Sequence, residues 1–333
     1  MFEKLVHEKV LITGGQGFLG AWIARKLLKA GAPFTLLDLR PDDGILAQIL
    51  PQAATGALER RFVDITDGAA VRRAVEESEA TRIIHLAGLQ IPTCKADPLL
   101  GARVNVLGTL NVFEAARALR GQVRSVVYAS SAAVAGRVSD YRGAIADAAP
   151  HVPRTHYGVF KTANEGNARV YFDDHGVQSI GLRPLVVYGV GREVGISSAP
   201  TKAIKAALLG RPFRIGFRGP TGFAYCEDMA ATFIACAQAE PHGALALNMQ
   251  AAIDTVERFV SYLETAIPSA RGLITYGGEP LPVAYDFAYD GLEALLGRGS
   301  VPFTPLEAGI EATARLFGEL KAQGRLHDRD LAG

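Results

Sequence analysis

The stretch V-L-I-T-G-G-Q-G-F-L-G at residues 10–20 decides the fold. Residues 10–13 have the composition of a buried parallel strand, glycines stand at 14, 15, 17 and 20, and a helical pattern covers residues 18–28. A glycine turn between a strand and a helix gathers backbone amides at the positive end of the helix dipole, and an anion can approach where β-carbons are missing. We interpret this stretch as the pyrophosphate loop of a dinucleotide site; a merely tight strand-to-helix turn is the alternative.

The composition indicates a globular chain with a large core. The chain has 333 residues, 49% of them hydrophobic and 21% charged, which fits one large domain or two closely joined ones. The net charge of +1 comes without long like-charge runs, so we expect neither nucleic acid nor a membrane surface as a partner. A small molecule is the better default substrate.

The N-terminal sequence and the cysteine spacing indicate the cellular compartment and the state of the thiols. The N-terminus lacks an apolar secretory core, and no apolar run approaches the roughly 18 residues of a membrane span, so we expect a cytoplasmic protein. Cys94, Cys226 and Cys236 are odd in number and show no C-x-x-C spacing. This argues against a disulfide framework and a structural zinc site, and we expect no metal and three buried thiols.

Acidic residues follow the next two predicted strands. The strand at residues 34–39 carries Asp38, 18 residues beyond Gly20, where a carboxylate accepts hydrogen bonds from an adenosine ribose and repels a 2′-phosphate. This favours NAD over NADP, although Arg40 softens the preference. Asp64 follows the strand at residues 60–63, where it could reach the adenine amino group. Each residue also has a purely structural alternative. Asp38 could be a solvated strand end, and in the segment D-I-T-D at residues 64–67 Thr66 or Asp67 could cap the following helix.

Two further strands are predicted to end at the same edge of the sheet. The strand at residues 82–86 leads into H-L-A-G, where the small residues Ala87 and Gly88 let backbone pass beside a cofactor. We interpret His85 as a packed strand residue rather than a catalyst. A helical pattern over residues 98–119 places Asn105 facing inward, and the strand at residues 123–129 stops at Ser130-Ser131. Such a hydroxyl pair either contacts substrate or belongs to an ordinary loop.

Tyr157 and Lys161 open a helix that is predicted to run to about residue 174. At the i,i+4 spacing the phenol and the ammonium project from one helical face, and a neighbouring cation stabilises a phenolate. Tyr157 could then exchange a proton with a substrate hydroxyl near neutral pH. The alternative is that Tyr157 and Lys161 are ordinary surface residues. The serine loop and the dinucleotide loop that precede the pair disfavour this alternative.

The second half of the chain is less regular. After a strand at residues 178–182 comes R-P-L-V-V-Y-G-V-G-R, which breaks regular structure at the expected crevice. Helices are predicted at residues 199–209, 228–239, 256–266 and 306–320, an extended piece at 223–225 and a returning strand at 245–249. We therefore expect a dinucleotide-binding domain at residues 1–185, with 223–249 returning to it, and a substrate-binding lobe at 186–222 and 250–333.

The order of motifs resembles the extended short-chain dehydrogenase/reductase family, the NAD-dependent epimerase/dehydratase group. The resemblance runs from T-G-G-Q-G-F-L-G through D-I-T-D, H-L-A-G, N-V-L-G-T, V-Y-A-S-S-A-A-V and Y-G-V-F-K to R-P-L-V-V-Y-G, and weakens after about Arg192. It implies an α/β fold, a Rossmann-type doubly wound parallel sheet of seven strands with a smaller C-terminal lobe. It also implies a homodimer formed through the helices at residues 98–119 and 155–174.

The resemblance also assigns the site. Its catalytic residues map onto Ser131, Tyr157 and Lys161, with Asn105 supporting the lysine through water and with Lys161 and the cationic nicotinamide lowering the pKa of Tyr157. The expected cofactor contacts are Gly14, Gly17, Phe18, Leu19, Gly20, Asp38, Asp64, Ile65, Leu86, Ala87, Tyr157, Lys161, Pro184 and Val187. The expected substrate contacts are Gln90, Ser131, Ala132, Tyr157 and Arg192.

Departures from the family pattern bear on the substrate. Family members that act on nucleotide sugars usually carry Asn where this chain has Val186, and Arg-Asp-Phe where it reads Thr221-Gly222-Phe223. A smaller substrate is implied, a sugar, a sugar acid or a similar hydroxy/keto compound, whose carboxylate or phosphate Arg192 or Arg218 could bind.

Several activities remain open. The pattern does not separate net dehydrogenation from epimerisation, and a nucleotide-sugar epimerase stays an alternative. A dehydratase is disfavoured, because Ala132-Ala133 follows Ser131 where dehydratases usually have Asp-Glu. The remaining alternative is an NAD-binding sensor without catalysis.

Overall fold

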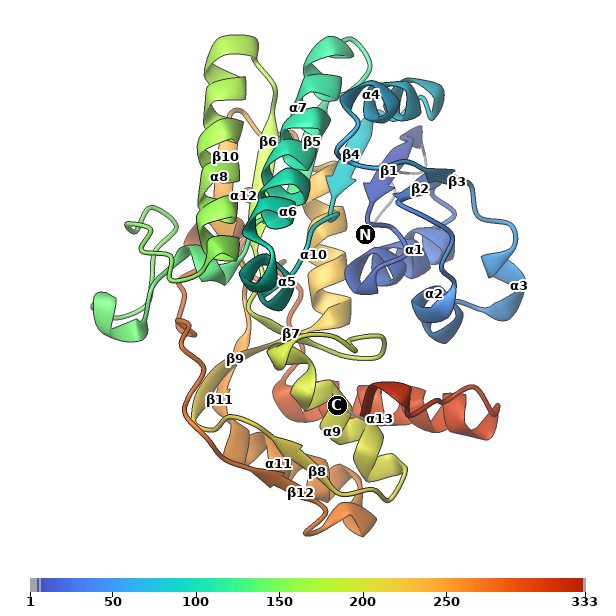
Figure 1. Cartoon of the computed structure of the whole chain (residues 1–333), viewed down its shortest axis with the longest axis vertical. Helices are drawn as coiled ribbons and strands as arrows, with labels where there is room; N and C mark the ends of the chain where they lie inside the picture. Colours follow the sequence, from blue (N-terminus) through green and yellow to red (C-terminus); the bar gives the residue numbers. More distant parts are fainter. Residues whose placement is uncertain (1–4, 6, 332–333) are drawn as a thin grey trace.

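The computed structural model describes residue 5 and residues 7–331, with the side chains of residues 52 and 53 left out. Residues 1–4 and 6, which form part of the segment that we expect to lack a secretory core, lie outside the described residues, as do residues 332 and 333. The chain forms a larger half around one sheet and a smaller lobe below it, in the orientation of Figure 1.

Seven parallel strands form the central sheet in the order β3-β2-β1-β4-β5-β6-β10. Their bounds are β1 Val10–Thr13, β2 Phe34–Asp38, β3 Arg60–Phe62, β4 Arg82–His85, β5 Ser125–Ala129, β6 Ser179–Arg183 and β10 Ala244–Asn248. The strand order reverses between β1 and β4, and in such sheets ligands bind in the crevice at the carboxyl ends there. The predicted Rossmann-type fold is confirmed, including the return of the strand near residue 245 to the sheet edge.

Alternating side chains of the strands enter two separate cores. Val10 and Ile12 of β1 join the core that contains α1 and α10, whereas Leu11 joins the core that contains α4, α7 and α8. Figure 1 shows these helices on the two faces of the sheet. The helices of this half are α1 Phe18–Ala30, α2 Gly44–Ile49, α3 Gln52–Thr55, α4 Gly68–Glu77, α5 Ile91–Ala96, α6 Pro98–Ala102, α7 Gly108–Ala118, α8 His156–His175 and α10 Cys226–Gln238.

The helix predicted at residues 98–119 contains a widened turn. A π-helical segment, Arg103–Leu107, separates α6 from α7 and carries Asn105. Inside it the carbonyl of Asn105 accepts hydrogen bonds from Thr109 Oγ1 at 2.7 Å and from Asn164 Nδ2 of α8 at 2.8 Å. Side-chain donors from two helices therefore satisfy this carbonyl, and π turns of this kind are frequent at functional sites.

In the described residues, the smaller lobe contains two short sheets and the helices α9, α11 and α13. Strands β11, β9 and β7 form one sheet, and β12 pairs with β8 in the other. The bounds are β7 Val186–Tyr188, β8 Phe213–Ile215, β9 Pro220–Tyr225, β11 Ala252–Thr255, β12 Ile274–Tyr276, α9 Ala199–Leu208, α11 Val256–Ala266 and α13 Leu306–Ala322. Helix α12, Asp290–Leu296, lies in the larger half beside β10. Residues 223–225 thus lie in the small sheet, because β9 pairs with β7 and β11, whereas α10 and β10 lie against and within the large one.

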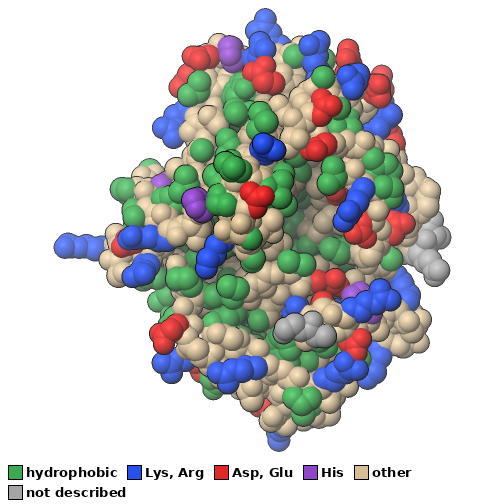
Figure 2. Space-filling view, viewed as in Figure 1, with side chains coloured by type: hydrophobic (Ala, Val, Ile, Leu, Met, Phe, Trp, Pro, Cys, Tyr) green, Lys and Arg blue, Asp and Glu red, His purple; other side chains and the backbone are tan. Residues whose placement is uncertain are grey.

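Burial agrees with the expectation for the cysteines. Cys94, Cys226 and Cys236 are all free and buried. Acidic and basic side chains are interspersed over the face shown in Figure 2. Among the described residues, no helix combines the length and the apolar character needed to cross a bilayer.

Candidate active site

The glycine loop packs too tightly for side chains. A β-carbon at Gly14 would lie 2.8 Å from the backbone nitrogen of Ala87, and one at Gly20 would lie 2.5 Å from the carbonyl oxygen of Gly14. Gly17 is the N-cap of α1, which has no side-chain cap and no acidic residue in its first turn. The first-turn amides, including those of Phe18 and Leu19, therefore lack a side-chain acceptor, which fits an anion such as a pyrophosphate.

The two predicted acidic residues lie at strand ends on this side of the sheet. Asp38, at the end of β2, accepts a hydrogen bond from the amide of Gln16 in the glycine loop at 3.0 Å. Asp64 is exposed and accepts from the amide of Thr66 at 2.9 Å, while the neighbouring Asp67 caps α4. The capping prediction is confirmed for Asp67. The loop and Asp38 together offer the donors and the carboxylate that an adenosine dinucleotide requires.

Ser131 and Tyr157 are close neighbours. Ser131 is the second residue after β5, and its Oγ accepts from the amide of Ala133 at 3.1 Å. Tyr157 lies in the first turn of α8, which Thr155 caps by accepting from the amide of Gly158 at 3.0 Å. Burial raises the pKa of Tyr157, while a hydrogen bond with Ser131 and the charge of Arg192 oppose the rise.

Lys161 is not among the groups that shift the pKa of Tyr157 within this chain. Burial is the largest effect within the chain, whereas the predicted lowering involves Lys161 together with the cationic nicotinamide and stays a prediction. Lys161 is positioned as predicted, with its Nζ 5.5 Å from the centre of the Tyr157 ring. The chain thus keeps Tyr157 protonated, as a general acid must be before it gives up its proton.

Lys161 is a buried cation tied to the sheet. It is 5% exposed, and its Nζ donates to the carbonyl of Ala129 at the end of β5 at 2.5 Å. Burial lowers its pKa to about 8, and the charges of Cys94 and Glu165 oppose that shift. The ammonium form therefore still predominates at neutral pH.

Asn105 lies beside Lys161, and protein groups hold its side chain. Its Oδ1 accepts from the amide of Leu89 at 2.7 Å and its Nδ2 donates to the carbonyl of Leu89 at 2.9 Å. A β-carbon at Gly88 would lie 3.2 Å from Asn105 Oδ1 and 3.8 Å from Lys161 Nζ, so the H-L-A-G turn lies next to both side chains. Asn105 fixes this turn directly.

The other predicted contact residues fall into three groups. Leu86 and Ala87 adjoin the glycine loop, because their amides donate to the carbonyl and the hydroxyl of Thr13 at 3.0 and 3.3 Å. Pro184 adjoins Ala132, whose amide donates to the Pro184 carbonyl at 3.1 Å. Ile65 is buried against α7 next to Gly108, and Val187 is buried within β7.

The predicted substrate contacts Gln90 and Arg192 bind each other. With the Gln90 amide oriented to satisfy its neighbours, its oxygen accepts from Arg192 NH1 at 3.1 Å and its nitrogen donates to the carbonyl of Val194 at 3.2 Å. The guanidinium lies over the ring of Phe18, with 5.8 Å between its central carbon and the ring centre. The segment after β7 thus reaches across to the start of α1.

The sequence did not predict a buried charge network that contacts Ser130. Glu165 accepts from Ser130 Oγ at 2.5 Å and from the guanidinium of Arg183 at 2.7 and 2.9 Å. Its sequence signal is that Glu165 stands four residues after Lys161 and eight after Tyr157, on the same face of α8. The network holds the ends of β5 and β6 against this helix.

His85 links the glycine loop to the π-helical segment. Its Nδ1 lies 2.6 Å from Thr13 Oγ1 and its Nε2 lies 3.0 Å from Thr109 Oγ1. Burial lowers its pKa to about 3, with a further contribution from the charge of Lys161, so the ring is neutral. Since the Thr109 hydroxyl donates to the Asn105 carbonyl, we infer that His85 Nε2 carries the proton and that Thr13 donates to Nδ1. The interpretation of His85 as a packed residue is confirmed.

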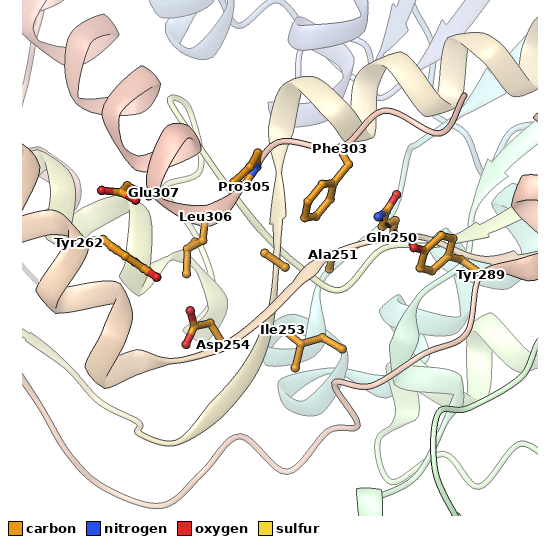
Figure 3. A pocket seen from close by; sticks show the side chains of 11 residues that line it. Gln250, Ala251, Ile253, Asp254, Tyr262, Tyr289, Phe303, Pro305, Leu306 and Glu307 are labelled. Carbon is orange, nitrogen blue, oxygen red and sulfur yellow. Dashed lines mark hydrogen bonds between the residues drawn. The ribbon is translucent and has the colours of Figure 1, made fainter. Parts of the chain in front are cut away.

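The smaller lobe carries a separate pocket of about 440 Å³ between β11, α11 and the start of α13, shown in Figure 3. Asp254 lies on its wall, where its carboxylate accepts from Arg258 Nε at 3.1 Å. Neither Ser131, Tyr157 nor Lys161 lines this pocket, so it holds none of the acid-base groups described above.

Solved structures of related proteins share this architecture. The UDP-glucose 4-epimerase of Thermus thermophilus, solved in complex with NAD, superposes with a TM-score of 0.76 at 25% identity, over 93% of this chain and 99% of that one. A partial consensus L-threonine 3-dehydrogenase superposes with a TM-score of 0.80 at 21% identity, over 94% of this chain and 99% of that one, which supports the fold alone.

Curated relatives cover only part of the chain. A UDP-glucose 4-epimerase from Azospirillum brasilense is 30% identical over 63% of this chain and 59% of its own length, and a uronate dehydrogenase from Pseudomonas syringae pv. tomato is 33% identical over 53% and 58%. The chain therefore spans less than two thirds of these two relatives. Residues 10–248 match the model of the NAD dependent epimerase/dehydratase family, and the chain belongs to this family.

Proposed function

We propose that this chain is an NAD-dependent oxidoreductase that interconverts a secondary alcohol and a ketone on a small carbohydrate-like substrate, a sugar or a sugar acid. The observation that carries the proposal is the grouping of Ser131, Tyr157 and Lys161 at the carboxyl ends of the strands, on the side where the glycine loop lies. The fold provides the loop, and the three side chains provide acid-base chemistry.

Each side chain has a distinct role in this proposal. Tyr157 gives a proton to the substrate oxygen or takes one from it, and Ser131 holds the same oxygen through its hydroxyl. Lys161, fixed by the Ala129 carbonyl, binds the nicotinamide ribose and favours the phenolate when Tyr157 releases its proton. NAD, when bound, supplies the hydride acceptor or donor.

The cofactor preference rests on Asp38. Its carboxylate accepts from the Gln16 amide of the glycine loop, which supports a role in binding the ribose diol and repelling a 2′-phosphate. We therefore expect NAD to bind more tightly than NADP. Titration of the protein with each reduced cofactor, followed by nicotinamide fluorescence, measures the preference, and tighter NADPH binding would reverse it.

A small substrate is supported by the residues at two positions, one in β7 and one in β9. Val186 is buried and apolar, and Thr221 is buried with no hydrogen-bond partner for its hydroxyl, where family members for nucleotide sugars carry Asn and Arg. Two of the relatives are named for acids, the uronate dehydrogenase and a D-erythronate dehydrogenase from Cupriavidus necator that is 34% identical over 47% of this chain and 48% of its own length. Nucleotide-sugar epimerisation is the second candidate, favoured by the similarity to UDP-glucose 4-epimerases.

The test is a substrate panel of sugars, sugar acids and nucleotide sugars, followed by the absorbance of reduced nicotinamide and by product chromatography. We expect net reduction of NAD with a small substrate, and a loss of about 100-fold or more in turnover for Tyr157→Phe with NAD affinity nearly unchanged. The exposed Tyr276→Phe serves as the matched control.

Other outcomes would separate the alternatives. Activity with a nucleotide sugar alone would replace the small-substrate proposal, and a new isomer without net reduction would indicate an epimerase. Firm NAD binding with neither turnover nor isotope exchange on the whole panel would indicate a sensor.

A further inference from the structure

The guanidinium of Arg192 is held by neutral groups only. NH2 donates to Ser197 Oγ at 2.8 Å, NH1 donates to the Gln90 oxygen at 3.1 Å, and the group lies over the Phe18 ring. Its Nε is buried without an acceptor. Among residues 7–331 no carboxylate forms an ion pair with Arg192, so the chain fixes this cation in place without neutralising it.

The nearest carboxylate in the sequence is turned away. Glu193 accepts from Gln48 Nε2 of α2 at 2.8 Å and lies 3.6 Å from the Nζ of Lys205, which is 1% exposed. Lys205 also forms an ion pair with Asp330 at 2.7 Å. The buried cation Lys205 therefore pairs with Glu193 and ties the segment that carries Arg192 to α2, α9 and the C-terminal residues.

Arg192 also lies on the reacting side of the site. Its charge opposes the rise in the pKa of Tyr157, and the phenol opposes the fall in the pKa that burial causes at Arg192. Geometry points the same way, because Gln90, which accepts from NH1 of Arg192, stands two residues after Gly88, where a β-carbon would lie 3.8 Å from Lys161 Nζ. Arg192 is half-buried, and withdrawing a cation even partly from water without a counter-charge is costly. A carboxylate is the group that matches a guanidinium best.

We propose that Arg192, fixed by Gln90 and Ser197, is an anion subsite that binds the carboxylate of the substrate while Tyr157 acts on a hydroxyl of the same molecule. This inference rests on the proposed function and narrows it from sugars in general to sugar acids. It also explains why Glu193 is held away, because a neighbouring carboxylate would compete with the substrate for the guanidinium.

The cofactor pyrophosphate is the other source of an anionic oxygen, because Phe18 opens the helix at the glycine loop. The first-turn amides of α1 already suit that group, and Gln90 holds the guanidinium beside the turn that adjoins Lys161. Replacing Arg192 distinguishes the two anions. If Arg192 binds the substrate carboxylate, the replacement weakens substrate binding; if it binds the pyrophosphate, the replacement weakens NAD binding.

The experiment compares acids with their neutral counterparts. D-Glucuronate, D-galacturonate and D-gluconate are tested beside D-glucose and D-galactose with the wild type, Arg192→Gln and Arg192→Lys. The exposed Arg298→Gln is the matched control, expected to behave as the wild type. We expect the wild type to prefer an acid, and Arg192→Gln to lose about 100-fold in kcat/KM for it, mainly through KM. Arg192→Lys should recover part of this loss, and NAD affinity should change less than about 2-fold.

A second experiment measures binding of the acids without requiring turnover. Thermal unfolding of NAD-saturated Tyr157→Phe is measured with each acid, and a rise in Tm that disappears in the Tyr157→Phe/Arg192→Gln double variant supports the subsite even if no turnover is found. Three results would overturn it: an NAD affinity that falls about 100-fold in Arg192→Gln, a wild type that prefers the neutral sugars, or no acid that binds.

Discussion

Glu165 accepts hydrogen bonds from the guanidinium of Arg183 through both of its carboxylate oxygens, at 2.9 and 2.7 Å. The side chains are 3% and 4% exposed, so this is an ion pair inside the protein, with Ser130 as a further donor. It joins α8, which carries Tyr157 and Lys161, to the end of β6. The same ion pair therefore stabilises the fold and positions the helix that carries Tyr157 and Lys161.

Removing one partner of this pair should be strongly destabilising. Glu165→Gln leaves Arg183 buried without its counter-charge, and we expect the free energy of unfolding to fall by about 3–5 kcal/mol. Urea denaturation followed by circular dichroism measures the change. The exposed pair Lys9–Glu79 provides the control, since Glu79→Gln should leave the free energy of unfolding almost unchanged. Equal losses in the two variants would contradict the role of burial.

Gly20 is the glycine whose replacement should harm the loop most directly. A β-carbon there would lie 2.5 Å from the Gly14 carbonyl oxygen and 2.7 Å from Gly15 Cα, and backbone has no room to move aside cheaply. We expect Gly20→Ala to weaken NAD binding by about 100-fold or more, measured by titration against nicotinamide fluorescence. Gly318→Ala in α13, where a β-carbon meets nothing within 4 Å, is the control and should bind NAD normally. Undiminished affinity in Gly20→Ala would show that the loop does not hold the cofactor.

His85 should make stability depend on pH. Burial lowers its pKa to about 3, below the ordinary value near 6.5 that it regains on unfolding. The unfolded chain therefore binds the extra proton as the pH falls through 6.5, and the folded state loses stability between about pH 6.5 and pH 3. At pH 5 this amounts to about 2 kcal/mol relative to neutral pH.

A variant isolates this contribution from that of the carboxylates. His85→Gln retains one acceptor and one donor for Thr13 and Thr109 but binds no proton, so its unfolding free energy should fall by about 2 kcal/mol less between pH 7.5 and pH 5. Urea unfolding at both pH values gives the difference, with the exposed His7→Gln as the control that follows the wild type. If wild type and His85→Gln lose equal stability, His85 is not held neutral.

The parts of the fold that the sequence predicted depend on local pattern. The glycine loop, the strands with their acidic ends and the i,i+4 pair of Tyr157 and Lys161 are all set by spacing within one or two elements. Position in the chain alone even limited the cap of α4 to Thr66 or Asp67, and Asp67 is the residue that accepts from Ala70.

The parts that the sequence did not predict depend on distant segments. The partner of Glu165 is on β6, 18 residues away, and Glu193 turns from its neighbour Arg192 because Lys205 of α9 and Gln48 of α2 lie behind it. The pKa of Tyr157 also depends on distant segments, since the surrounding chain decides how much water reaches the phenol. Such effects need the packed structure.

Exposed apolar side chains support the homodimer that the family resemblance implies. On α6 and the π-helical segment Leu99, Leu100 and Leu107 are 76%, 42% and 44% exposed, and on α8 Val159 and Val170 are 47% and 55% exposed. Figure 1 shows α7 and α8 side by side on the outer face of the sheet. Apolar groups gathered on adjacent helices are typical of a surface that another subunit covers.

We therefore expect a light-scattering mass of two subunits in solution. Val159→Asp and Leu107→Asp place charge on this surface, which an apolar interface cannot bury cheaply, and both should shift the mass to one subunit. Ile253→Asp is the control, because Ile253 is 51% exposed in the smaller lobe, and it should leave the mass unchanged. A wild-type mass of one subunit would remove the dimer. A dimer that survives both charged variants would place the interface on another surface, since two buried aspartates at one apolar contact would cost more than such an interface can supply.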